Sequence, residues 1–239
     1  MPEKTDDEYL AYPEVEADPA TTRYSAYVDW RRVGALPRVV DQGACGSCWA
    51  FATISALESQ NYLVNGKLWK FSEQEVVDCN VLDYNCEFGG ITSRVVPQHY
   101  VARNISPRHG DTYPYTARDE SCKKDEASVE KSGINVTYQY EFSPPNSVSQ
   151  IMFLLDYGPV TTAISASNPY FMSYGGGIVT NFRCQGPLDH AVVTVGYGYD
   201  YDLGYYYWII RNSWGYGWGE DGHIRIAITN YYGVCNNQI

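Results

Sequence analysis

The sequence predicts an α+β protein with a mainly helical lobe followed by a mainly β-sheet lobe. In the first half, apolar residues recur at helical spacing between glycine and proline stops. In the second half, segments rich in β-branched and aromatic residues are separated by glycines. A cleft between two such lobes is a usual place for a site, so we expect functional residues from both halves.

Four helices are expected, each with recognisable start or stop residues. They cover residues 46–63, a segment from 72 onward, part of 92–102, and 147–157. Gly66 ends the first helix, and Ser72 with Glu75 has the spacing of a capping box at the start of the second. Pro97 marks the start of the third helix or a kink in it, and Gly158 ends the fourth.

Four strands are expected after the helices. They cover residues 159–166, 190–199, 205–214 and 222–228. Each contains several β-branched or aromatic residues, which fit a pleated, half-buried surface. We therefore place the helical lobe at about 25–135 and the sheet lobe at about 136–239.

The composition excludes several classes of function. The chain has 239 residues and a formal net charge of −11, which provides no electrostatic footprint for nucleic acid. It has no run of about 18 apolar residues, so we expect no membrane-spanning helix. The start of the chain also lacks the apolar segment of a signal peptide.

Residues 1–24 differ in amino-acid composition from the remainder of the chain. They carry seven acidic and two basic residues, three prolines and few branched apolar residues. This composition predicts an acidic, extended arm outside the core, or a plain disordered terminus. The folded domain is then expected at 25–239.

Cys45 and Cys48 form a Cys-x-x-Cys pair within the stretch QGACGSCWAF. Such a pair can be a redox disulfide, half of a zinc site, or one structural and one nucleophilic cysteine. No second pair of ligands at suitable spacing supports zinc. The chain has seven cysteines, so complete pairing within one chain leaves one over.

The motifs together resemble the papain family of cysteine proteases, from Tyr27 to Cys235. The resemblance is carried, in order, by YVDWR, QGACGSCWAF, SEQEVVDC, a Gly-Gly pair, YPY, GPV, DHAVVTVGYG, NSWGYGWGEDGHIRI and YGVC. It implies a two-lobed papain-like fold with the active-site cleft between the lobes. It also implies that the arm at 1–24 is the remnant of an inhibitory prosegment, and thus a zymogen.

The resemblance implies three disulfides, Cys45–Cys86, Cys79–Cys122 and Cys184–Cys235, which leave Cys48 free. Three disulfides indicate an oxidising compartment, so we expect a lysosomal, vacuolar or extracellular protein. Asn104 and Asn135 stand in glycosylation sequons, which fit the same route.

The resemblance also implies the catalytic residues. Cys48 would be the nucleophile and His190 its acid–base partner, and the two would rest as thiolate and imidazolium. Asn212 would orient the imidazole ring. Gln42 would donate a hydrogen bond to the oxyanion, and Trp214 would shield the pair from water.

Substrate-binding residues are expected on both walls of the cleft. Those near the extended peptide are Gly89, Gly90, Ile91, Thr92, Ala163, Leu188, Asp189 and Trp214. Within this set, Ile91, Thr92, Ala163 and Leu188 are mostly apolar and none is charged. They favour a hydrophobic or aromatic residue two positions before the cleaved bond. The segment Cys86-Glu-Phe-Gly-Gly has one residue more than the family's usual pattern.

We therefore expect a monomeric endopeptidase that acts on proteins or peptides without a metal or other cofactor. Cystatin-type proteins would be its inhibitors. Two alternatives remain open: a catalytically silent binding or storage protein on the same fold, and a thiol oxidoreductase that uses Cys45 and Cys48. Loss of the cysteine, histidine or asparagine would mark the first, but all three are present.

Overall fold

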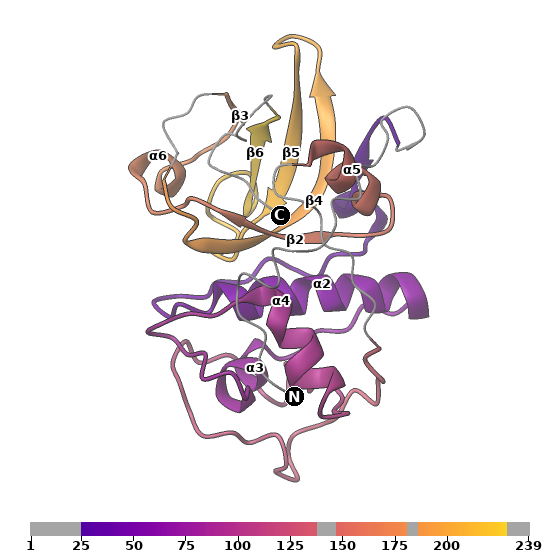
Figure 1. Cartoon of the computed structure of the whole chain (residues 1–239), viewed down its shortest axis with the longest axis vertical. Helices are drawn as coiled ribbons and strands as arrows, with labels where there is room; N and C mark the ends of the chain where they lie inside the picture. Colours follow the sequence, from indigo (N-terminus) through magenta and orange to yellow (C-terminus); the bar gives the residue numbers. More distant parts are fainter. Residues whose placement is uncertain (1–24, 138–146, 181–185, 229–239) are drawn as a thin grey trace.

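The computed structural model describes residues 25–137, 147–180 and 186–228. Figure 1 shows two lobes: one contains α2, α3 and α4, and the other contains the sheet with α5 and α6. The predicted α+β architecture is confirmed. The expected arm at 1–24 and the expected Cys184–Cys235 disulfide lie outside the described residues, so both stay predictions.

All four expected helices are present, with ends that differ by a few residues. The helical elements are the 3₁₀ turn η1 (Trp30–Val33), α2 (Cys48–Asn65), α3 (Glu73–Cys79), α4 (Thr92–Val95), the π-helical turn η2 (Val96–Val101), α5 (Val148–Leu155) and α6 (Pro169–Met172). The two short elements η1 and α6 were not expected. The hydroxyl of Ser72 accepts the N–H of Glu75 at 2.8 Å, which is half of the predicted capping box.

Two details of the helices differ from the sequence pattern. The Glu75 carboxylate does not return to Ser72, because it binds Nε2 of His99 and the hydroxyl of Tyr100, each at 2.8 Å. Pro97 has no N–H for the helical ladder, and the turn around it widens. The N–H of Ala102 accordingly donates to the carbonyl of Pro97, five residues back, at 2.9 Å.

The four expected strands are confirmed, together with two short strands that were not expected. The strands are β1 (Val28–Asp29), β2 (Val160–Ile164), β3 (Ile178–Val179), β4 (His190–Asp200), β5 (Tyr205–Arg211) and β6 (His223–Ala227). Within the described ranges they form one sheet in the order β1-β4-β5-β6-β3, with β2 also paired to β4. Among the strand pairs of the described residues, only β3–β6 is parallel.

Strand β4 is the centre of the sheet and places one end at the lobe boundary. Its first half pairs with β2, from His190 opposite Ile164 onward, and its second half pairs with β1. Strand β5 lies antiparallel on the other side, with Val193 opposite Arg211. The start of β4 and the residue after β5 therefore lie close together, which brings His190 and Asn212 to the same edge.

Each lobe has its own core, and α2 contributes to both sides. Trp49 and Ile54 are fully buried in the core of the helical lobe. Ala52, on another face of the same helix, packs with Val193 and Ile209 of the sheet. Helix α2 is thus held from both lobes. Figure 1 shows it lying along the boundary, next to β2 of the sheet lobe.

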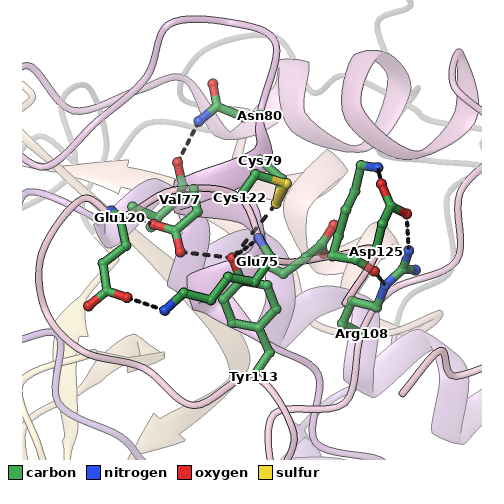
Figure 2. Close-up of a disulfide and its surroundings, with 12 residues drawn as sticks. Glu75, Val77, Cys79, Asn80, Arg108, Tyr113, Glu120, Cys122 and Asp125 are labelled. Carbon is green, nitrogen blue, oxygen red and sulfur yellow. Dashed lines mark hydrogen bonds and ion pairs between the residues drawn. A yellow bond between two sulfur atoms is a disulfide. The ribbon is translucent and has the colours of Figure 1, made fainter. Parts of the chain in front are cut away.

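Two disulfides lie in the helical lobe. Cys45 is bonded to Cys86 and Cys79 to Cys122, as the resemblance implied. Their sequence separations of 41 and 43 residues correspond to about 4 kcal/mol of stabilisation each in the chain-entropy model. Figure 2 shows the second disulfide with the hydroxyl end of Tyr113 directed toward it.

Candidate active site

Cys48 is the first residue of α2 and faces the sheet lobe. The helix has 18 residues, so its N-terminus carries a partial positive charge next to the thiol. Gly46 allows the chain to turn closely before the cysteine: its N–H donates to the carbonyl of Cys86 at 2.8 Å. A Cβ at this position would lie 2.7 Å from that oxygen, so a larger residue would clash. Cys48 is the only free cysteine among the residues that the structure describes.

His190 and Asn212 form a hydrogen-bonded pair on the sheet lobe. Nε2 of His190 lies 2.7 Å from Oδ1 of Asn212. The same oxygen accepts the N–H of Ser213 at 2.8 Å. An amide oxygen can only accept hydrogen bonds, so Nε2 of His190 must donate to it. Nε2 therefore carries a proton, and in the neutral ring Nδ1 is left as the acceptor.

Aromatic rings enclose the imidazole. The ring of Trp214 lies 5.0 Å from that of His190 at an interplanar angle of 34°. Phe171 of α6 is buried and lies edge-on to both rings, 5.3 Å from Trp214 and 6.4 Å from His190. These contacts exclude water and leave His190 only 7% exposed. Such surroundings strengthen the hydrogen bond to Asn212.

Gln42 is held from both lobes beside Cys48. Its Oε1 accepts the hydroxyl of Ser213 at 2.5 Å, and its N–H donates to the Ser213 carbonyl at 2.8 Å. Its Nε2 donates to the carbonyl of Cys45 at 3.0 Å. The amide nitrogen carries two protons, so one N–H is left for a further acceptor. Ser213 thus connects Gln42 with Asn212.

A groove of about 580 Å³ runs between the lobes at Cys48 and His190. This volume suits a ligand-binding site. All but one of the predicted substrate-binding residues line it, namely Gly89, Gly90, Ile91, Thr92, Ala163, Leu188 and Asp189. The exception is Trp214, which lies against His190. Glu87 and Phe88, which include the extra residue of this loop, also line the groove.

The Asp189 carboxylate is engaged by the backbone of the sheet lobe. Its Oδ1 accepts the N–H of Ala166 at 2.7 Å, and its Oδ2 accepts the N–H of Ser167 at 3.1 Å. These bonds stabilise the negative charge and fix the side chain. Asp189 is therefore held as part of the loop that leads into β4.

Burial shifts the pKa values of Cys48 and His190 against their charged forms. It raises the pKa of the Cys48 thiol, although hydrogen bonds from the backbone N–H groups of Ala191 and Trp49 oppose the rise. It lowers the pKa of His190, although the hydrogen bond to Asn212 and the nearby Asp189 carboxylate oppose the decrease. Both shifts favour the neutral thiol and the neutral imidazole, which runs against the resting thiolate and imidazolium that the resemblance implied.

The described residues contain no group of three or more His, Cys, Asp or Glu side chains that could hold a metal ion. No helix in these ranges is long and apolar enough to cross a membrane.

Three residues of the site were not found from the sequence: Tyr115, Phe171 and Ser213. Tyr115 binds the segment around Gln42, and Ser213 connects Gln42 to Asn212. Each acts through partners that are distant in sequence. The motifs YPY and NSWG were the available signals, but a motif does not indicate which atoms meet.

This two-lobed arrangement is the papain-like fold. The bromelain protease from Ananas comosus, in complex with the E64 inhibitor, matches with a TM-score of 0.80 and 37% identity, over 90% of this chain and 96% of that chain. The Carica candamarcensis cysteine protease CMS1MS2, in complex with E-64, matches with a TM-score of 0.76 and 34% identity over the same shares.

The sequence comparisons agree with the fold. The model of the papain family cysteine proteases matches residues 24–239, and the chain belongs to this family. Cysteine protease XCP2 of Arabidopsis thaliana is 38% identical over 91% of this chain and 57% of that protein. Cysteine endopeptidase RepA of Oryza sativa subsp. japonica is 41% identical over 87% of this chain and 54% of that protein. The chain thus spans little more than half the length of these relatives.

Proposed function

We propose that the protein is a cysteine endopeptidase that hydrolyses peptide bonds through an acyl-enzyme on Cys48. The observation that carries this proposal is the placement of two elements on one groove. The free Cys48 lies on one wall of the groove, at the start of α2. His190, which is hydrogen-bonded to Asn212, lies on the other wall. A thiol with an oriented imidazole beside it is the arrangement that nucleophilic catalysis requires.

The reaction begins with transfer of the Cys48 proton to Nδ1 of His190. The two groups become charged together, which avoids an isolated charge in a buried site. The thiolate attacks the substrate carbonyl, and the imidazolium then protonates the leaving amine. Oδ1 of Asn212 accepts a hydrogen bond from the Nε2–H of His190 throughout and keeps the ring aligned. Water hydrolyses the resulting thioester and returns the site to its starting state.

The oxyanion is stabilised by two N–H groups. One is the backbone N–H of Cys48, at the N-terminus of α2. The other is the second N–H of the Gln42 side-chain amide. The first N–H of this amide donates to the carbonyl of Cys45. Donors that are fixed before the reaction stabilise charge that develops in the transition state.

The groove would hold the peptide in extended form. Gly89 and Gly90 have no side chains, so a substrate backbone can lie close to them. Ile91, Ala163 and Leu188 supply apolar surface for a side chain of the substrate. Proteins and peptides are therefore the proposed substrates, and groove-blocking proteins of the cystatin type are the proposed inhibitors of a monomeric enzyme.

Two further features favour an oxidising compartment, either extracellular or a lysosome or vacuole. Disulfides such as Cys45–Cys86 and Cys79–Cys122 persist there. The sequon residues Asn104 and Asn135 are both exposed and accessible to glycosylation.

The alternatives fit the site less well. A thiol oxidoreductase needs Cys45 to pair with Cys48, but Cys45 is bonded to Cys86. A silent binding protein does not require the alignment of Asn212, His190 and Gln42 that the site retains.

The test is covalent labelling combined with cleavage of blocked peptides. The protein is treated with E-64, the inhibitor found with bromelain and CMS1MS2, and the adduct is mapped by mass spectrometry. We expect one adduct on Cys48 and loss of hydrolysis of an N-acetylated, C-amidated peptide. Cleavage that continues after complete labelling, or labelled protein that never cleaved such peptides, would contradict the proposal.

A further inference from the structure

Tyr113 and Tyr115 lie two residues apart in one motif, and their hydroxyls have different partners. Tyr115 contacts the loop that leads to Cys48: its hydroxyl lies 2.8 Å from the carbonyl of Gln42 and 2.6 Å from Oγ of Ser47. Tyr113 contacts the region of the second disulfide instead, where its hydroxyl donates to Asp78 at 2.9 Å (Figure 2). Only Tyr115 is connected to the active site.

The directions of the two bonds at Tyr115 follow from their chemistry. A carbonyl can only accept, so the single hydroxyl proton of Tyr115 goes to Gln42. The hydroxyl of Ser47 must then donate to Tyr115. The result is a chain of hydrogen bonds with one direction, from Ser47 through Tyr115 to Gln42. The ring is fixed edge-on against Phe51 of α2 at 4.7 Å.

This series of hydrogen bonds changes how α2 begins. Ser47 is the N-cap residue, and an N-cap serine ordinarily accepts an N–H of the first helical turn. Here the side chain of Ser47 makes no capping bond, and its proton goes to Tyr115. A hydroxyl that donates can still accept, so it is the position in which the bond to Tyr115 holds Oγ that keeps this oxygen from the cap. Ser47 is fully buried, so water does not compete for it. The N–H of Trp49, a usual target of such a cap, instead acts to lower the pKa of the Cys48 thiol against the effect of burial.

We propose that Tyr115 is a positioning residue that fixes the oxyanion-binding side of the site and keeps Ser47 from capping α2. It acts through Gln42 and Ser47 and does not line the groove. The inference rests on the proposed function for its effect on turnover. Its effect on the Cys48 thiol can be measured independently of turnover.

The variant Tyr115→Phe removes only the hydroxyl and keeps the ring against Phe51. The matched control is Tyr113→Phe, which removes a hydroxyl from the same motif. We expect Tyr115→Phe to lower kcat by about three- to tenfold, the equivalent of one net hydrogen bond, with KM changed by less than about twofold. Tyr113→Phe should lower the melting temperature at least as much and leave kcat unchanged.

The second readout is the rate at which iodoacetamide alkylates Cys48 as a function of pH. In Tyr115→Phe the side chain of Ser47 is free to rotate, so its oxygen can cap α2 and compete with the thiol for the N–H of Trp49. The apparent thiol pKa should therefore rise. In the double variant Ser47→Ala, Tyr115→Phe no cap can form, so the pKa should return to the wild-type value while kcat remains low through Gln42.

Equal kcat losses in the two tyrosine variants, or a wild-type kcat and alkylation profile in Tyr115→Phe, would overturn the inference. A rise in thiol pKa that persists in the double variant would overturn the role of Ser47. Failure of the proposed function looks different: wild-type protein then cleaves no peptide, while the alkylation profiles still report whether Tyr115 controls Ser47.

Discussion

His190 and Asn212 lie at the ends of two paired antiparallel strands, and the 2.7 Å bond between Nε2 and Oδ1 fixes the imidazole ring. This relationship decides which nitrogen is available to Cys48. Because Nε2 donates to Asn212, Nδ1 is the atom that would take the thiol proton in the proposed mechanism. The rings of Trp214 and Phe171, which pack against the imidazole, shield that bond from water.

Replacement of Asn212 tests this orientation. We expect Asn212→Ala to lower kcat by about 10- to 100-fold, because a hydrogen bond to a group that becomes charged is lost. KM should change little, since Asn212 does not line the groove. Asn212→Gln is the control for size and polarity. A kcat within about twofold of the wild-type value in Asn212→Ala would contradict the role.

Substrate preference tests the apolar part of the groove. We expect peptides with Phe or Leu two residues before the cleaved bond to be preferred over peptides with Arg there. The reason is the apolar surface of Ile91, Ala163 and Leu188, with the Asp189 carboxylate occupied by two backbone N–H groups. Matched fluorogenic peptides give kcat/KM for each residue.

The variant Leu188→Asp supplies the comparison, since it should raise the relative rate with Arg. A clear preference of the wild-type protein for Arg would mean that Asp189 is available to the substrate. The assignment of these residues to that position would then be wrong.

Acid stability depends on His223, whose pKa burial lowers to about 4 with help from the nearby charges of Arg211 and Arg31. Between that pH and about 6.5 the unfolded chain binds a proton that the folded protein does not. The free energy of unfolding should therefore decrease as pH falls from about 6.5 to 4, by about 3 kcal/mol in total.

Urea unfolding at pH 7 and pH 4.5 measures this contribution. In His223→Gln the decrease between the two pH values should be smaller by about 2 kcal/mol, because the proton uptake of the unfolded chain at this position is gone. Other titrating groups are present in both proteins and cancel in the difference. Identical decreases in the two proteins would refute the assignment.

The sequence predicted the helices and strands that have strong periodicity. Its resemblance to the papain family pointed to Cys48, His190, Asn212 and Gln42 as catalytic residues, and that role stays a prediction. It did not predict the partner of the Glu75 carboxylate, which lies on another helix. It also missed Ser213 and Tyr115, whose partners are 171 and 73 residues away in the chain. Such contacts arise from packing within and between the lobes, and local sequence contains no information on which atoms then meet.

The identity of the nucleophile is tested most directly by peptide hydrolysis in Cys48→Ala. The variant removes the thiol but neither of the disulfides Cys45–Cys86 and Cys79–Cys122, so the melting temperature should stay close to that of the wild-type protein. The wild-type protein should cleave a blocked peptide, and the folded variant should show no turnover above the uncatalysed rate. Cleavage by purified, folded Cys48→Ala at a rate near that of the wild type would contradict the account.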